Sequence, residues 1–199
     1  MSFLLQGRPG PAWTAAFLLL AAMSGDGHAN VDVNIKANII NNTCQITVEN
    51  SGYVPLPIVS LDYFNSRGNP PSPLLPTDAA SGTPFKIRVD DCASWNAGYA
   101  NRLHFQFRPR SGLFPSGSNQ VFINESSEGA ENIGVVVFSD STNKNVLNTD
   151  GTSDVVYDIE DKTESQSFID YLFYVRYQNT GPASAGKVTS NVLVSVNYD

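Results

Sequence analysis

The stretch that decides the fold reads VTSNVLVSVNYD over residues 188–199. From residue 192 onward an apolar or aromatic side chain occupies every second position, which is typical of a β-strand that buries one face. With Val188 added, the predicted inward face comprises Val188, Val192, Val194, Val196 and Tyr198. The strand runs to Asp199. We therefore expect the sheet edge beside it to be closed by something other than a following strand.

The same period of two recurs along the chain and predicts an all-β protein. No window of the sequence has helical periodicity over more than two turns. Short strands separated by turn-forming residues favour a two-sheet sandwich. One apolar run, at 134–138, is unbroken, as in a strand covered on both faces. The predicted strands before the last one are 31–39, 44–48, 85–89, 103–107, 134–138 and 168–177.

Composition limits the class of protein. The chain has 199 residues, of which 41% are hydrophobic and 16% charged, so one domain with a buried core is expected. Its formal net charge of -7 argues against nucleic-acid binding, because phosphate contacts need a basic surface. The longest apolar run is too short to span a bilayer, so no direct membrane insertion is expected.

Residues 1–29 have the pattern of a secretory signal peptide. Arg8 supplies the positive start, residues 12–23 supply the apolar segment, and Gly27-His28-Ala29 has the small-x-small cleavage pattern. The mature chain is therefore expected to begin at Asn30, with cleavage after Gly25 as the alternative.

Export changes the interpretation of the two cysteines. In an oxidising compartment, Cys44 and Cys92 are expected to form a structural disulfide. Closing a loop of this length stabilises the fold by about 4 kcal/mol in the chain-entropy model. The chain has no CxxC motif, and His104 is the single histidine after residue 29, so no metal site is expected.

A proline-rich segment lies inside the ring that this disulfide closes. Seven of the 12 prolines fall within residues 55–84, and proline cannot sit in a central strand because it donates no hydrogen bond. We interpret the segment as a crossover loop. An interdomain linker is the alternative, and the closed ring disfavours it.

Motifs for catalysis and cofactor binding are missing, and neither an enzyme nor a cofactor is expected. The sequence has no G-x-S-x-G, phosphate loop or H-E-x-x-H, and His104 lies on the polar side of a predicted strand. Asp90-Asp91 and the acidic group at 158–161 lack the spacing of a calcium loop. Trp95 and Tyr99 could stack on a sugar, although such aromatics more often pack against a loop or a disulfide.

The amino-terminal strand complements the carboxy-terminal one. Residues 30–36 form an amphipathic strand with no Gly or Pro before Ile39, so we expect that it cannot easily double back onto its own sheet. A strand offered to the open edge of another copy would satisfy both ends of the chain. An ordinary edge strand of a self-contained sandwich is the alternative, and spacing alone leaves both open.

The order and spacing of several motifs are similar to those of a known family. They are an alternating extension that starts at Val31, 13 residues before Cys44; an apolar strand ending in the second cysteine, 85–92 (FKIRVDDC); a central strand, 131–140 (ENIGVVVFSD); 174–177 (YVRY) followed by 186–188 (GKV); and Gly186, fourteenth from the end, with the penultimate Tyr198. The chain thereby resembles subunits of chaperone–usher fimbriae, of the type 1 and P pilus kind, and is closest to minor, adaptor-type subunits.

The resemblance implies an incomplete immunoglobulin-like sandwich that lacks its final strand. It divides the chain into a signal peptide (1–29), an N-terminal donor-strand extension (30–40) and a pilin domain (41–199). The implied donor residues are Val31, Val33, Ile35, Ala37 and Ile39. The implied chaperone-binding and acceptor groove comprises Gly186, Val188, Val192, Val194, Val196, Tyr198 and Asp199. The sequence departs from the family at Ala37, where glycine is common.

The resemblance also implies partners and a place in the cell. A periplasmic chaperone would lend the missing strand and bind the Asp199 carboxylate through basic residues. At an outer-membrane usher, the extension of the next pilin subunit would replace that strand, and the subunit would become part of an adhesive fimbrium on the bacterial surface. A tip or lectin-like subunit that binds host carbohydrate through the region of Trp95 and Tyr99 is the alternative function. A secreted enzyme is less favoured. A terminating subunit, which accepts no further strand, is a further alternative within the class of structural subunits.

Overall fold

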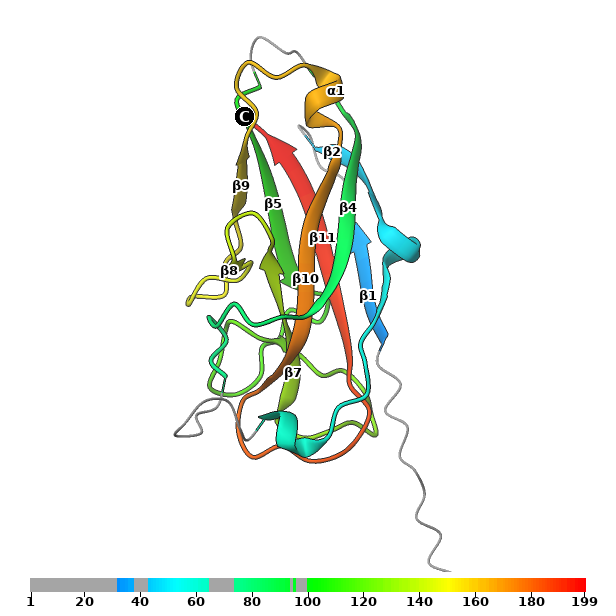
Figure 1. Cartoon of the computed structure of the whole chain (residues 1–199), viewed down its shortest axis with the longest axis vertical. Coiled ribbons are helices and arrows are strands. Elements are labelled where there is room, and N and C mark those ends of the chain that lie inside the picture. Colours follow the sequence, from blue (N-terminus) through cyan, green and yellow to red (C-terminus); the bar gives the residue numbers. More distant parts are fainter. Residues whose placement is uncertain (1–31, 38–42, 65–73, 94, 96–99) are drawn as a thin grey trace, which may run out of the picture.

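The computed structural model describes residues 32–37, 43–64, 74–93, 95 and 100–199, with backbone placement alone for 32–37. Two β-sheets pack face to face, and helix is limited to single turns (Figure 1). No helix within these ranges is long and apolar enough to cross a membrane. The elements are β1 (Asp32–Ala37), β2 (Cys44–Val48), η1 (Glu49–Gly52), β3 (Tyr53–Pro55), η2 (Leu61–Phe64), β4 (Thr83–Cys92), β5 (Arg102–Pro109), β6 (Phe122–Ile123), β7 (Ile133–Ser139), β8 (Lys144–Asn145), β9 (Val155–Asp158), α1 (Glu164–Ser167), β10 (Asp170–Asn179) and β11 (Thr189–Tyr198).

The predicted all-β fold is confirmed, and it is an immunoglobulin-like sandwich. Sheet A has the strand order β3-β1-β11-β5-β9, and sheet B has the order β2-β4-β10-β7-β6, with β8 paired to β7. The alternating residues of the long strands point into one shared core. Its centre is aromatic: Phe105 of β5 lies 4.8 Å from Tyr171 and 5.6 Å from Phe173 of β10, measured between ring centroids.

The run at 133–139 forms β7, in which all seven residues are buried. Val135 and Val137 point into the main core, whereas Val136 and Phe138 belong to a second apolar cluster on the outer face of sheet B. This outer cover explains why the strand is apolar throughout instead of alternating.

The outer cover includes Val121 and Tyr174, together with Arg176, whose guanidinium lies 5.3 Å from the centre of the Phe138 ring and also binds the proline-rich segment. Arg176 of β10 is 2% exposed, and its guanidinium donates to the carbonyl oxygens of Leu75 (2.8 Å) and Asp78 (2.9 Å). The adjacent Gln178 donates to the carbonyl of Leu74 at 2.7 Å. The segment joins β3 of sheet A to β4 of sheet B, so it is a crossover within one sandwich.

The disulfide between Cys44 and Cys92 is present, as the sequence predicts. It joins the first residue of β2 to the last residue of β4, and the two cysteines are direct partners in that antiparallel pair. Both are buried, so the bond fixes one edge of sheet B from inside the core.

Candidate strand-acceptor groove

The two edges of β11 have different partners. On one edge β11 pairs antiparallel with β5 through seven residue pairs, from Val192–Pro109 to Tyr198–Leu103. On the other edge it pairs parallel with β1 through six residue pairs. Parallel ladders are slightly less stable per residue than antiparallel ones. The β1 edge is therefore the weaker of the two.

The second neighbour of β1 is the short strand β3. β1 and β3 pair antiparallel over three residue pairs, from Asp32–Pro55 to Asn34–Tyr53, and β3 has no other partner in sheet A. The side chain of Val54 is 2% exposed and belongs to the core. β1 thus fills a gap with β11 on one side and β3 on the other, which we call the acceptor groove.

Three of the predicted donor positions lie in this groove, opposite inward positions of β11. The pairs in register are Val33–Ser190, Ile35–Val192 and Ala37–Val194. The other two predicted donor residues, Val31 and Ile39, lie outside the described residues, as does the signal peptide predicted over 1–29. The departure from the family at Ala37 therefore falls opposite Val194 in this arrangement.

The expectation that the extension cannot double back onto its own sheet is wrong. β1 pairs parallel with β11, yet Thr43 forms an antiparallel bridge with Asn197 of the same strand. The described segments that end at Ala37 and begin at Thr43 therefore run in opposite directions along β11.

The predicted inward face of β11 is confirmed for its valines. Val188, Val192, Val194 and Val196 are at most 3% exposed, and the odd-numbered residues from 189 to 197 are partly exposed. Ser190 completes the inward face. The predicted face did not include it because its side chain is polar, although strict alternation places it there. It is fully buried, and its hydroxyl donates to the carbonyl of Ile123 at 2.8 Å.

Gly186 lies where the chain enters β11, and close backbone packing explains why glycine is needed there. A Cβ at this position would lie 2.5 Å from the nitrogen of Ala130, closer than real Cβ contacts occur. The absence of a side chain lets Lys187 form a parallel bridge with Gly129. Gly186 thus positions the end of the groove instead of lining its paired section.

An apolar cavity of about 160 Å³ lies at this end of the groove. Among its lining residues are Ile58, Leu61, Phe64, Tyr177, Gly186 and Val188. The Tyr177 hydroxyl donates to the carbonyl of Pro57 at 3.1 Å, and burial raises the pKa of this phenol to about 12. Ile58 remains 63% exposed at the cavity mouth. Val188, which lines the cavity, directly precedes Thr189, the first residue of β11 that pairs with β1.

The other end of β11 is engaged within the chain. The Tyr198 ring packs edge-on against Trp95 at 5.5 Å, and its hydroxyl donates to the carbonyl of Ala93. Tyr198 and Asp199 thus lie beyond the section that β1 fills.

Asp199 is held by Arg102, the first residue of β5, and by Asn101, which precedes that strand. Its main-chain oxygen accepts hydrogen bonds from the amides of Asn101 (2.6 Å) and Arg102 (3.2 Å). Its side-chain carboxylate lies 3.4 Å from Nε2 of His104, whose Nδ1 lies 2.8 Å from the carboxylate of Asp154.

Trp95 is packed into the edge of the core. Its ring contacts Phe168 edge-on at 5.0 Å as well as Tyr198, and Tyr99 lies outside the described residues. Of the two aromatic residues predicted for the alternative sugar site, the structure thus describes Trp95 alone, and it is partly buried. Within the same ranges, no cluster of three or more acidic, histidine or cysteine side chains is placed to hold a metal ion.

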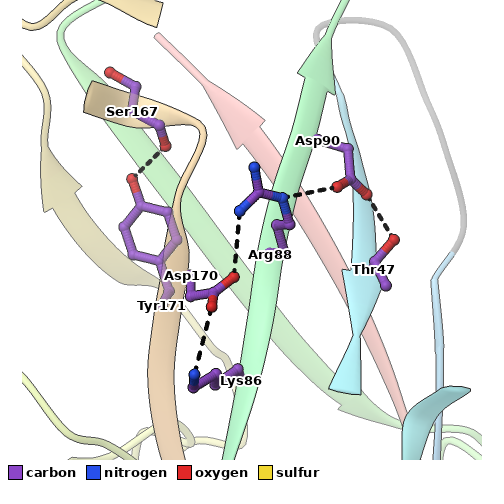
Figure 2. Close-up of polar contacts among 7 residues, drawn as sticks. All are labelled: Thr47, Lys86, Arg88, Asp90, Ser167, Asp170 and Tyr171. Atoms are coloured by element: carbon purple, nitrogen blue, oxygen red, sulfur yellow. Dashed lines mark hydrogen bonds and ion pairs between the residues drawn. The ribbon is translucent and has the colours of Figure 1, made fainter. Parts of the chain in front are cut away.

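The outer face of sheet B is a useful contrast, because its polar contacts are exposed. Figure 2 shows a row of charged side chains on β10 and β4 that continues to Thr47 on β2. Asp170 lies 3.5 Å from both Lys86 and Arg88, and Arg88 lies 3.4 Å from Asp90, which accepts a hydrogen bond from Thr47. These side chains are 36–53% exposed. Exposed pairs of this kind contribute little to stability.

The chain is similar to the following known proteins. The CupB6 tip adhesin of Pseudomonas aeruginosa aligns with 58% of the chain at a TM-score of 0.38 and 16% identity, and the chain spans 34% of that protein. The fimbrial-like protein YadK of Escherichia coli K12 is 37% identical over 188 residues, with 91% of each chain covered. The F17 fimbrial protein of Escherichia coli is 25% identical over 190 residues, covering 90% of this chain and 94% of its own.

The model of the family described as fimbrial protein matches residues 33–199, which include both sheets and the disulfide. With this match and the identity to YadK over nearly the whole length, the chain belongs to the fimbrial protein family.

Proposed function

We propose that this fimbrial subunit polymerises by donor-strand exchange. Its extension, residues 30–40, leaves the groove beside β11 and fills the same groove of a neighbouring subunit. A periplasmic chaperone lends a strand to the groove before assembly, and an outer-membrane usher exchanges that strand for the next subunit's extension. The resulting fimbrium contributes to cell adhesion.

The position of β1 carries the proposal. Fimbrial proteins assemble with other subunits into pili at the cell surface, so the chain is exported and has neighbours. Its sheet A is continuous only with β1 in place, because β11 and β3 are each joined to β1 and not to each other. A strand inserted between two others, and connected to the sandwich at one end, is the kind of element that can be replaced by an equivalent strand.

Strand orientation favours replacement. The chain's own strand makes six parallel pairs with β11 and three antiparallel pairs with β3. A donor that enters in the opposite direction makes the longer ladder antiparallel and the shorter one parallel. Since antiparallel pairing is slightly more stable per residue, this donor is the better occupant.

The tether opposes replacement and gives the chaperone a role. β1 is connected to Thr43 through five residues, 38–42, so its effective concentration at the groove is on the order of mM. A free neighbour at lower concentration competes poorly with it. A chaperone strand that occupies the groove from the time of folding keeps β1 out and available for donation.

The apolar cavity at the Val188 end supports a donor longer than β1. β1 covers residues 32–37, whereas the predicted donor residues extend from Val31 to Ile39. A parallel donor brings Val31 to this end and an antiparallel donor brings Ile39. Either side chain is apolar and can enter the cavity, which lies next to Thr189.

Cross-linking within assembled fimbriae tests the proposal. The full chain carries Asn34→Cys in β1 and Asn191→Cys in β11, two positions that are partners in the parallel ladder. A short bismaleimide is then added to the isolated subunit and to fimbriae. We expect an internally cross-linked monomer from the subunit and a ladder of covalent multimers from the fimbriae.

Chains with Asn34→Cys alone are the matched control and should give no ladder. Internally cross-linked monomers from fimbriae as well as from the isolated subunit would show that β1 stays in its own groove, and the proposal would be wrong.

The chaperone step has its own test at the carboxy-terminal end. Deletion of residues 198–199 removes the Tyr198 ring and the carboxylate that the chaperone is expected to bind. Co-purification of the subunit with the periplasmic chaperone of its assembly system should then be lost. Undiminished co-purification would contradict this role of the carboxy-terminal end.

A further inference from the structure

We infer that Asn124 is a positioning residue that sets how firmly β11 holds the strand beside it. Asn124 lies just after β6, on a loop that continues to Ala130. It acts through the first residues of β11 and is not itself part of the groove. The inference rests on the proposed function, because release of a strand needs to be controlled only if the strand is exchanged.

The Asn124 amide makes all four hydrogen bonds that an asparagine side chain offers. Its nitrogen donates to the carbonyl oxygens of Ala130 (3.0 Å) and Lys187 (2.9 Å). Its oxygen accepts from the main-chain amides of Ser126 (3.1 Å) and Thr189 (2.8 Å). Two of these partners belong to its own loop and two to the chain entering β11. One side chain therefore joins the loop to the start of the strand.

The loop takes the place of β5 along the start of β11. The β5 ladder begins at Val192, and the amide of Arg110 adds a bond to the carbonyl of Asn191. Before Asn191, the loop binds the main-chain groups of Thr189. The Thr189 carbonyl accepts a hydrogen bond from the amide of Glu125 at 2.6 Å. The Asn191 side chain adds a hydrogen bond to the carboxylate of Glu125.

This support matters because Thr189 to Asn191 are also where β1 begins to pair. Alternate residues of a strand direct their main-chain groups to opposite edges. With Thr189 and Asn191 bound on the loop and β5 side, the main-chain groups of Ser190 face β1. If the bonds to the loop break, Thr189, Ser190 and Asn191 are no longer supported on the side opposite β1. These residues form three of the six pairs between β1 and β11, so half of that ladder is weakened.

Asn124 also stands in an N-x-S sequon, residues 124–126. With every hydrogen-bonding position of the amide occupied, the side chain has a structural role at this site. The crowding nearby agrees with such a role, because a Cβ at Gly129 would lie 2.3 Å from the Asn124 nitrogen.

Hydrogen exchange on the full chain tests the inference, with Asn124→Ala compared with Asn145→Ala. Asn145 is a matched control because its side chain also joins loops, donating to the carbonyls of Pro76 and Gln120 and accepting from the amide of Leu147, each at 2.9 Å. It lies on β8, in sheet B. Global stability of each variant is measured by denaturant unfolding.

We expect Asn124→Ala to speed exchange at the amides of Ser190, Val192 and Val194 about tenfold more than its loss of global stability explains, as expected for loss of about 1.4 kcal/mol of local stability. Asn145→Ala should change these amides only in proportion to global stability. If Asn124→Ala does not fold, Asn124→Asp serves instead, because it keeps an acceptor for Thr189 but replaces the two donor bonds with a carboxylate oxygen that faces the carbonyls of Ala130 and Lys187. Its effect should fall on the same amides. Equal effects of the 124 and 145 variants would overturn the inference.

A second readout separates this inference from the proposed function. A labelled peptide of residues 30–40 is added to the wild-type chain and to both variants at a concentration above the effective concentration of the tethered β1, which is on the order of mM. If wild type binds the peptide and the two variants release it at equal rates, the role of Asn124 is refuted but strand exchange is not. No uptake by any chain refutes strand exchange, whereas faster release from the Asn124 variant supports both.

Discussion

The two neighbours of β11 make similar numbers of residue pairs and yet have different roles. β5 pairs antiparallel over seven residues, is an integral strand of the sandwich and carries buried aromatic side chains into its centre. β1 pairs parallel over six residues, near the start of the chain, and joins the rest of the sandwich through five residues. Under the proposed function, β5 is a permanent part of the fold, whereas β1 completes the sheet and can be replaced by an equivalent strand.

Damage to the β5 side should be large and should not be repaired by a donor strand. Phe105 is fully buried against Tyr171 and Phe173, so Phe105→Ala is expected to cost about 3–5 kcal/mol through lost burial and the cavity that remains. Denaturant unfolding measures this loss. The peptide of residues 30–40 should not restore it, and full restoration would mean that the two edges of β11 are equivalent.

Alkaline pH should lower the stability of the fold through one buried tyrosine on the groove side of β11 and one on the β5 side. Variants of the two tyrosines separate these contributions. Burial raises the pKa of Tyr177, at the groove end, to about 12, and it also raises the pKa of Tyr171, which contacts Phe105. An unfolded tyrosine ionises near pH 10 and the folded one does not. Stability is therefore complete below about pH 10 and falls as pH rises to 12, by about 2–3 kcal/mol for Tyr177.

Unfolding as a function of pH checks this expectation in Tyr177→Phe and Tyr171→Phe. Each variant should lose part of the alkaline dependence, and Tyr177→Phe should also lose the bond to Pro57 at neutral pH. A wild-type stability that does not change from pH 9 to 12 would contradict the burial of both phenols.

The smallest effect on stability is expected on the outer face of sheet B, away from both edges of β11. Asp170→Asn removes the partner of Lys86 and Arg88, whose side chains are about half exposed. Solvent and salt screen such pairs, so the change in unfolding free energy should be no more than about 1 kcal/mol and should shrink in high salt. A larger effect would show that these charges stabilise the β4–β10 pair.

Local patterns in the sequence predict much of this structure. Alternation identifies the inward face of β11, and the cysteine count in an exported chain predicts the Cys44–Cys92 bond. The unbroken run at 134–138 correctly indicates a strand covered on both sides. In each case one physical rule acts on neighbouring residues, so no knowledge of the fold is needed.

The features that the sequence did not predict depend on contacts between distant segments. The partner of β1 is 157 positions away at the first pair, from Asp32 to Thr189, and no local signal reports such a pairing. Asn124 binds mainly to main-chain atoms, which any residue type supplies. Arg176 is a buried charge held by carbonyl oxygens of a loop about 100 positions earlier in the chain. A sequence pattern predicts which face is buried, but not which segment covers it.

Strand replacement in solution tests the central claim most directly. The chain without residues 30–37 is refolded alone and with a peptide of residues 30–40, and molar mass and unfolding are measured. We expect the truncated chain alone to be unstable or to self-associate, and the peptide to bind one to one and restore a cooperatively unfolding monomer. A peptide with Ile35→Asp is the control and should not restore it. A truncated chain that folds cooperatively as a monomer without any peptide would contradict the account.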